Sequence, residues 1–303
     1  MRAMKKALLV GINTYTFNDV GAHDRKDDLG GCLNDVEAMS QLLAGPLFKF
    51  EVAKLTESDA DRTTILKMLE NLVTEAGPGS QLVFYFAGHG SQASVDGRLC
   101  EIICPSNLVY DGHWKNGISD EDLWGVFGKV PKGVSIEVLL DSCCSNGMAF
   151  AGRQSDDGSG GPEGRSLRYL APRQGTDRDA ADSCADRVRF SGEKPKQGCQ
   201  YVFWSAAEGT AHERPFEDVP HGVFTYHFHK LLTGTNGNVS RKIFFSRLWT
   251  ALGGDEGQKP QWASNTNTSV IERILAPMDA AVTGFIHKVR HMVRRFFPYM
   301  ENA

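Results

Sequence analysis

The chain has 303 residues, of which 41% are hydrophobic and 23% charged, as is typical of a soluble globular protein with a large buried core. Its formal charge of −4 leaves no basic excess to neutralise phosphates, so we expect no nucleic-acid partner. Its seven cysteines are an odd number without a C-x-x-C pair, which favours neither a disulfide framework nor a zinc site.

The sequence has no apolar run of transmembrane length, and its charged start leads into a short strand rather than a signal peptide. We therefore predict a cytoplasmic protein without firm membrane association. A reducing cytoplasm would also keep the cysteines as free thiols.

The first third of the chain alternates strand and helix patterns. Apolar runs predict strands at 7–13 and 50–55, and apolar residues at helical spacing predict helices from Asn34 or Asp35, as the cap, and over 62–76.

Two buried strands end in chemically active residues. One runs from residue 81 into Gly88-His89-Gly90, and the other from residue 134 into Asp141-Ser142-Cys143-Cys144. Strand carboxyl ends open into the crevice where α/β folds place their chemistry, and a Cys–His pair suits nucleophilic catalysis. Taken singly, a buried cysteine or a hydrogen-bonded loop histidine is the ordinary alternative. Together the two strand ends favour a catalytic pair, with Cys143 rather than Cys144 in the cleft, because only one of two consecutive strand-end cysteines can point into it.

The remaining segments complete the α/β pattern. A strand is expected at 98–104, a capped helix at Ser119-Asp-Glu-Asp-Leu123, a flexible loop at 151–198, a strand at 201–207, a polar loop at 208–220, helices at 224–232 and 240–252, and a last strand at 268–276. The edge of the 201–207 strand is predicted to pair with an extended peptide substrate. Residues 278–303 predict an amphipathic helix, for which packing on the body of the protein is favoured over partner docking or membrane binding.

The two strand ends also carry a family resemblance. Phe86-Ala-Gly-His-Gly-Ser91 and Leu139-Leu-Asp-Ser-Cys-Cys-Ser145 resemble the catalytic blocks of caspase-like cysteine peptidases, particularly metacaspases and their bacterial relatives. Segments 7–13, 29–36, 201–207 and 222–225 extend the resemblance over most of residues 5–275. The sequence departs from the family at Cys144, where histidine is usual, and at Ala87, where serine is common.

The resemblance implies a three-layer α/β/α sandwich around a mostly parallel sheet. Residues 1–277 would form one peptidase domain that includes the 151–198 linker, and 278–303 a helical extension. Cys143 would attack the scissile carbonyl, His89 would protonate the leaving amine, and the backbone amides of Gly90 and Cys143 would hold the oxyanion.

The same resemblance implies a specificity pocket. Cys32 and Asp35 match family positions that line it, and with Asp141 facing the same space the pocket would select Arg, or else Lys, before the scissile bond. A carboxylate serving only the amino end of a helix is the alternative for Asp35. Trp204 and Ser205 are expected near the cleft.

The linker contains seven arginines, at 153, 165, 168, 173, 178, 187 and 189. We predict that cleavage there, by the protein itself or by an upstream protease, activates the enzyme; an ordinary solvated connector is the alternative. Protein or peptide substrates are the expected partners, and no cofactor is required. Calcium activation through Asp120 and Glu121 is left open, although helix capping is favoured for both acids and the further acid expected after the nucleophile is replaced by Ala149 and Phe150.

Two other classes of function compete with a peptidase. A catalytically silent caspase-like scaffold would not need the intact His89 and Cys143. A different cysteine hydrolase or an acyltransferase would not need the acidic pocket positions.

Overall fold

The computed structural model describes residues 3–15, 27–95, 98–111, 113–143, 165–170, 199–207, 210–253, 257–264 and 274–275. Several of the expectations above concern residues outside the described ones. These are Cys144, positions 149 and 150 (where an acid was expected), most of the 151–198 linker, and the tail 278–303. Of the linker, only 165–170 is described.

A six-stranded sheet forms the centre of the molecule, in the order β14-β11-β9-β3-β1-β2. Its strands are β1 (Lys5–Gly11), β2 (Glu51–Thr56), β3 (Gln81–Ala87), β9 (Ser135–Asp141), β11 (Gln200–Ser205) and β14 (Gln261–Ser264). All neighbours pair in parallel except β11 with β14. Every residue of β3 is buried, as expected for a central strand covered on both faces.

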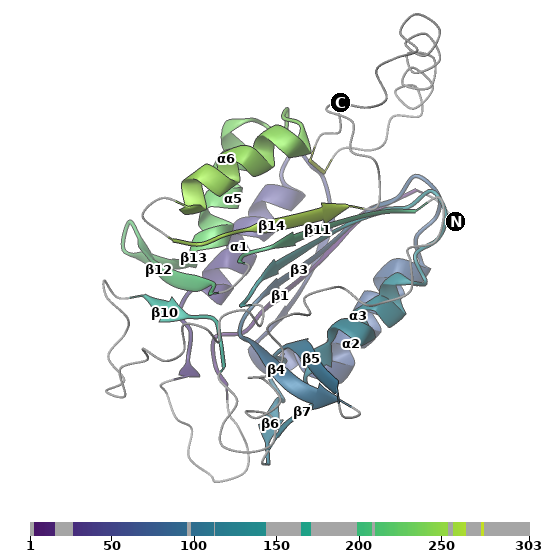
Figure 1. Cartoon of the computed structure of the whole chain (residues 1–303). Helices are drawn as coiled ribbons and strands as arrows, with labels where there is room; N and C mark the ends of the chain where they lie inside the picture. Colours follow the sequence, from purple (N-terminus) through teal and green to yellow (C-terminus); the bar gives the residue numbers. More distant parts are fainter. Residues whose placement is uncertain are drawn as a thin grey trace, which may run out of the picture.

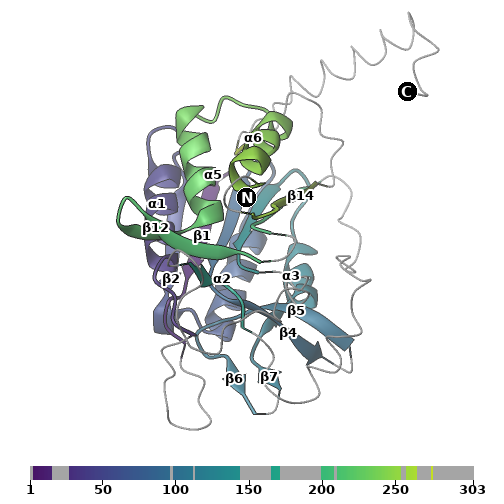
Figure 2. The same cartoon turned by 60° about the vertical axis from the view of Figure 1, so that its left-hand side comes forward.

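Helices cover both faces of this sheet (Figures 1 and 2). One face carries α1 (Cys32–Ala44), α5 (Val223–Gly234) and α6 (Arg241–Gly253), and the other carries α2 (Arg62–Thr74) and α3 (Asp120–Phe127). A short 3₁₀ turn, η2 (Glu57–Asp59), precedes α2. The predicted three-layer α/β/α sandwich with a mostly parallel sheet is therefore confirmed.

Three small sheets complete the architecture. They are formed by β4 (Gly90–Val95), β5 (Arg98–Ile103) and β8 (Ile118–Ser119); by β10 (Ser166–Leu167), β12 (His212–Phe216) and β13 (Val219–Gly222); and by β6 (Val109–Tyr110) with β7 (Trp114–Lys115). Because β4 directly follows the end of β3, and β10 and β12 gather at the same end, they frame the carboxyl edge of the central sheet (Figure 1).

Local signals explain where several helices begin. Ser119 caps α3 in a reciprocal capping box with Asp122, as the sequence predicted, and Asp61 caps α2 through the amides of Thr63 and Thr64. The predicted cap of α1 is wrong. The helix begins after Gly31, which places Asp35 in its first turn and frees that side chain for other partners.

Two further expectations need correction. The segment predicted as a polar loop over 208–220 contains the hairpin of β12 and β13, whose turn residues Glu217 and Asp218 have φ angles of 50° and 69°. This turn lacks the Asn-Gly or Asp-Gly pair that usually marks a two-residue hairpin, so it carried no strong sequence signal. Moreover, β11 is not a free edge, because β14 pairs with it, and no extended peptide can add there. Of the strand predicted over 268–276, only 274–275 is described, and it is a turn.

A buried ion pair lies behind the sheet. The Arg241 guanidinium donates to Glu137 Oε1 at 2.5 Å, and Glu137 also accepts hydrogen bonds from the Leu275 amide and the Trp204 indole. This pair joins α6 to the central strand β9. In the described part of the chain, no helix combines the length and apolar composition needed to cross a bilayer.

Candidate active site

His89 and Cys143 lie on neighbouring strand ends. In the parallel pairing of β3 with β9, Ala87 is opposite Asp141, so the two chains leave the sheet side by side. A Cβ atom on Gly90 would overlap the carbonyl oxygen of Cys143, and only glycine allows this approach. The sequence placed these two loops together correctly, because strand pairing fixes their register.

The side chains of this pair are shielded from water. Cys143 is 4% exposed, its thiol donates to the Ala211 carbonyl at 3.1 Å, and burial raises its pKa to about 12. His89 is 2% exposed, and burial lowers its pKa to about 4. Both groups are therefore neutral near pH 7 in this closed state.

The imidazole of His89 has a defined tautomer. Its Nε2 lies 2.7 Å from the carbonyl oxygen of Asp27, and a carbonyl can only accept, so the proton is on Nε2. Its Nδ1 is buried and has no hydrogen-bond partner among the described residues. The ring also packs on Tyr15, with centroids 4.9 Å apart. Nδ1 is thus a free base that can accept a proton.

A piece of the linker occupies the cleft between these loops. Ser166 and Leu167 form β10, which pairs antiparallel with β12, and the Arg168 amide donates to the Ala211 carbonyl at 3.0 Å. The Arg168 carbonyl oxygen accepts two hydrogen bonds, from the amides of Gly90 at 3.0 Å and Cys143 at 3.2 Å. Two such donors on one oxygen can stabilise negative charge that develops there.

The Arg168 side chain is completely buried and is surrounded by carboxylates. Its Nη2 donates to Asp35 Oδ2 at 2.5 Å and to Glu213 Oε2 at 3.3 Å. Its Nη1 lies 3.0 Å from Asp141 Oδ2 and donates to the Asp141 carbonyl at 3.1 Å. Together these acids raise the pKa of Arg168 well above its ordinary value despite burial, so the group is charged. A buried guanidinium needs such pairing.

Each carboxylate of the pocket is held by further donors. Asp35 accepts from the Gly222 amide at 3.0 Å and pairs with His221 Nδ1 at 2.8 Å. Asp141 accepts from the amide and the hydroxyl of Thr225, at 3.1 and 2.5 Å. Burial raises the pKa of Asp141 to about 6, with Arg168 opposing the shift and Asp35 adding to it.

Glu213 is the pocket residue that sequence reasoning missed. It lies on β12, inside the segment predicted as a loop, and accepts from the amides of Gly30 and Gly31 at 2.5 and 3.1 Å. These two amides precede α1, so Glu213 fastens the β12 strand to the start of the helix that carries Asp35. No local sequence pattern marks it, because its partners are far away in the chain.

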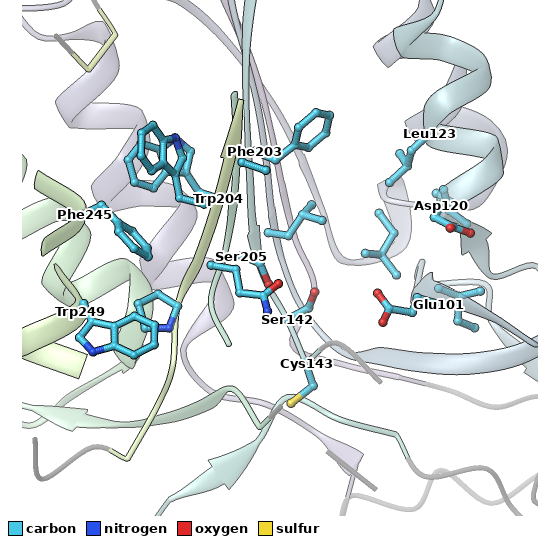
Figure 3. A pocket seen from close by; sticks show the side chains of 18 residues that line it. Glu101, Asp120, Leu123, Ser142, Cys143, Phe203, Trp204, Ser205, Phe245 and Trp249 are labelled. Carbon is cyan, nitrogen blue, oxygen red and sulfur yellow. The ribbon is translucent and has the colours of Figure 1, made fainter. Parts of the chain in front are cut away.

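The structure places the other predicted site residues as follows. Cys32 is fully buried at the start of α1, within electrostatic range of Arg168, and its amide donates to Asn13 Oδ1 at 2.9 Å. Trp204 and Ser205 lie instead on the wall of a cavity of about 420 Å³ at the end of the sheet (Figure 3). Cys143 stands at one end of this cavity, with Trp249 and Asp120 on opposite sides. A substrate contact for Trp204 or Ser205 stays a prediction.

The candidate calcium ligands make ordinary helix-end contacts. The Asp120 carboxylate accepts from the Glu121 amide at 3.0 Å, and burial raises its pKa. Within the residues that the structure describes, no group of three or more His, Cys, Asp or Glu side chains converges on a metal position. A calcium requirement stays untested.

The arrangement is that of a caspase-like fold, with a histidine and a cysteine at adjacent strand ends of a mostly parallel sheet. Caspase-1 from Spodoptera frugiperda has the same fold, with a TM-score of 0.52 at 11% identity over 92% of each chain. Protein GSU0716 from Geobacter sulfurreducens gives a TM-score of 0.67 at 17% identity, over 91% of this chain and 100% of its own. At these identities the likeness concerns the fold alone.

Residues 5–150 match the family model of the metacaspase, peptidase C14 domain. The chain is 32% identical to Metacaspase-1 of Schizosaccharomyces pombe over 158 residues, and 32% identical to Metacaspase-4 of Arabidopsis thaliana over 157 residues. These matches cover 47% and 48% of this chain. The chain spans about one third of the length of these relatives, 34% in both cases.

Proposed function

We propose that the protein is a cysteine endopeptidase that hydrolyses peptide bonds after arginine, and less efficiently after lysine. The observation that carries the proposal is Arg168, whose guanidinium fills the acidic pocket while its carbonyl oxygen accepts from Gly90 and Cys143. A substrate bound in this way would present its scissile carbonyl next to the cysteine. The match of residues 5–150 to the metacaspase family model supports the same reaction class.

In the proposed mechanism, Cys143 Sγ attacks the carbonyl carbon of the arginine before the scissile bond. The thiol proton passes to Nδ1 of His89, and the amides of Gly90 and Cys143 stabilise the oxyanion. The C–N bond then breaks as His89 returns the proton to the leaving amine, which leaves a thioester. Water, deprotonated by His89, hydrolyses the thioester and frees the cysteine.

The pocket favours arginine for a geometric reason. Asp35 and Glu213 contact Nη2 while Asp141 contacts Nη1. The two terminal nitrogens of the planar guanidinium are therefore paired with different carboxylates. A lysine ammonium offers one point of charge and would leave one of these acids unpaired. An aspartate substrate would add a further negative charge to three carboxylates, and we expect no measurable cleavage after it.

We further propose that the protein cuts its own chain at the Arg168–Tyr169 bond. Before the cut, residues 165–170 fill the cleft and exclude other substrates. A linked segment has a high effective concentration at its own site, so this bond would be the first substrate. Cleavage would free the groove and thereby activate the enzyme; an upstream protease is the second route to the same cut.

A fluorogenic panel with Arg, Lys or Asp before the reporter group tests the proposal. We expect cleavage of Arg peptides, slower cleavage of Lys peptides, and none of Asp peptides. Mass spectrometry of the purified chain should show a new amino terminus at Tyr169. If no peptide is cleaved and the chain stays whole, with or without added calcium, the protein is a binding scaffold of the same fold.

A further inference from the structure

The two residues that follow Arg168 are held as closely as those that precede it. Tyr169 forms a parallel bridge with Gly90, and the Leu170 amide donates to the Gly90 carbonyl at 3.0 Å. The Ser91 hydroxyl then donates to the Leu170 carbonyl at 2.6 Å. The start of β4 therefore binds the backbone on the far side of the scissile bond.

The side chains after Arg168 are also more buried than the one before it. Leu170 is 3% exposed and belongs to the hydrophobic core, whereas Leu167 is 39% exposed. Tyr169 is half-buried, packs against the same core and lies near Cys143 and Cys104. Apolar area removed from water contributes to binding roughly in proportion to its extent, so Leu170 contributes much more than Leu167.

The Tyr169 hydroxyl adds a detail to this subsite. It is buried, and no hydrogen-bond partner for it is present among the described residues. An unpaired buried hydroxyl opposes binding, so the aromatic ring of Tyr169 favours binding while its hydroxyl adds no affinity. Phenylalanine should suit it at least as well as tyrosine.

We infer that the cleft has two subsites for the residues after the scissile bond, the first for an aromatic and the second for an aliphatic side chain. This inference rests on the proposed peptidase function. The substrate class it names is a chain with arginine, then Tyr or Phe, then Leu or a similar aliphatic residue. Apart from the preference for arginine, substrate selectivity then depends mainly on the residues after the scissile bond, whose backbone binds to residues 90 and 91 of β4.

Internally quenched peptides test this inference. The parent peptide is Ser-Leu-Arg-Tyr-Leu-Ala, the sequence of residues 166–171, and the enzyme is the full wild-type chain after its cut at the Arg168–Tyr169 bond, as verified by mass spectrometry. Replacing the second leucine by asparagine, which has the same number and branching of side-chain heavy atoms, should lower kcat/KM about tenfold or more, because a buried apolar side chain becomes polar. Replacing the first leucine by asparagine is the matched control and should change little. Exchanging tyrosine for phenylalanine should not lower the rate.

A variant of the protein provides a second readout. Ser91→Ala removes the donor to the carbonyl of the second residue after the bond. The ratio of kcat/KM for the parent peptide to that for an Arg-aminomethylcoumarin, which has no residue in that position, should fall by about threefold to tenfold, the loss of one hydrogen bond.

The two levels of failure are distinguishable. If both leucine replacements have equal effects and Ser91→Ala leaves the ratio unchanged, the inference is wrong although the enzyme cleaves after arginine. If the wild-type chain cleaves neither the peptides nor the coumarin substrate, the proposed function itself is wrong.

Discussion

The guanidinium of Arg168 lies 2.5 Å from the carboxylate of Asp35, although the two residues are 133 positions apart in the chain. Neither side chain is exposed to water. Removing one charge from such a buried pair leaves the other uncompensated, which is strongly unfavourable. The contact therefore fixes residues 165–170 in the cleft, as the proposed cut after Arg168 requires.

The first prediction concerns the nucleophile. Cys143→Ala should abolish peptidase activity, because it removes the thiol beside the two backbone donors, and the purified chain should stay whole at the Arg168–Tyr169 bond by mass spectrometry. Cys144→Ala is the control and should retain most activity. Equal loss from both variants would contradict the assignment. A Cys143→Ala chain that is still cut during expression would point to an upstream protease.

The second prediction concerns the processing site. Arg168→Gln keeps a polar side chain but removes the charge and shortens the chain, so cleavage at the Arg168–Tyr169 bond should stop. Arg165→Gln, three residues earlier in the same described segment, should leave that cut intact. Amino-terminal sequencing of the fragments distinguishes the two variants. Continued processing of the Arg168→Gln chain at the same bond would exclude the arginine pocket as its cause.

The third prediction concerns the pocket wall formed by Gly222. A Cβ atom at this position would overlap Asp141 Oδ2 and lie 2.5 Å from Arg168 Nη1, while its φ of −61° is open to alanine. Gly222→Ala should therefore fold but raise KM for Arg peptides by about tenfold or more, since overpacking typically costs 1–3 kcal/mol.

Gly234, near the end of α5, is the matched control for that variant, because a Cβ there meets no atom within 4 Å. Gly234→Ala should leave KM unchanged. Thermal unfolding of both variants shows whether a change in KM reflects the pocket or a loss of folded protein.

The fourth prediction concerns pH. With Arg168 bound, the pKa of Asp141 is about 6, and burial is the main cause of this rise. The bound arginine lowers the pKa of Asp141, so in a pocket without arginine this pKa lies higher. Protonated Asp141 cannot pair with a guanidinium, so KM for Arg peptides should fall as the pH rises through about 6 and above. Asp141→Asn should raise KM and flatten this dependence. A KM that increases over the same pH range would contradict the role given to Asp141.

The fifth prediction concerns the contribution of the buried Arg241–Glu137 ion pair to stability. Arg241→Met should leave the buried carboxylate of Glu137 without its cation and lower the free energy of unfolding by about 3–5 kcal/mol in urea titrations. Lys242→Met, at the exposed next position of α6, should change it little. Similar losses from both variants would show that the ion pair contributes no stability.

The sequence alone determined the parallel strands of the sheet and the two strand ends. Apolar runs that stop at Gly88-His89-Gly90 and at Asp141-Ser142-Cys143 indicate buried parallel strands, and strand register then brings the two ends together. These features are local in the chain or follow from regular pairing, so a pattern of residue types is enough to predict them. The helix over 62–76 and the capped helix start at 119–123 were predictable for the same reason, because their caps lie within one turn.

Only the tertiary structure decided what fills the cleft. Among seven linker arginines, nothing in the sequence distinguishes Arg168. Its place follows from carboxylates on three separate elements, and Glu213, 45 positions later, lies on a strand that the sequence did not predict. A guanidinium can be buried only where enough paired charge converges to offset its lost hydration. That convergence depends on how α1, β9 and β12 pack together, so no short stretch of the sequence predicts it.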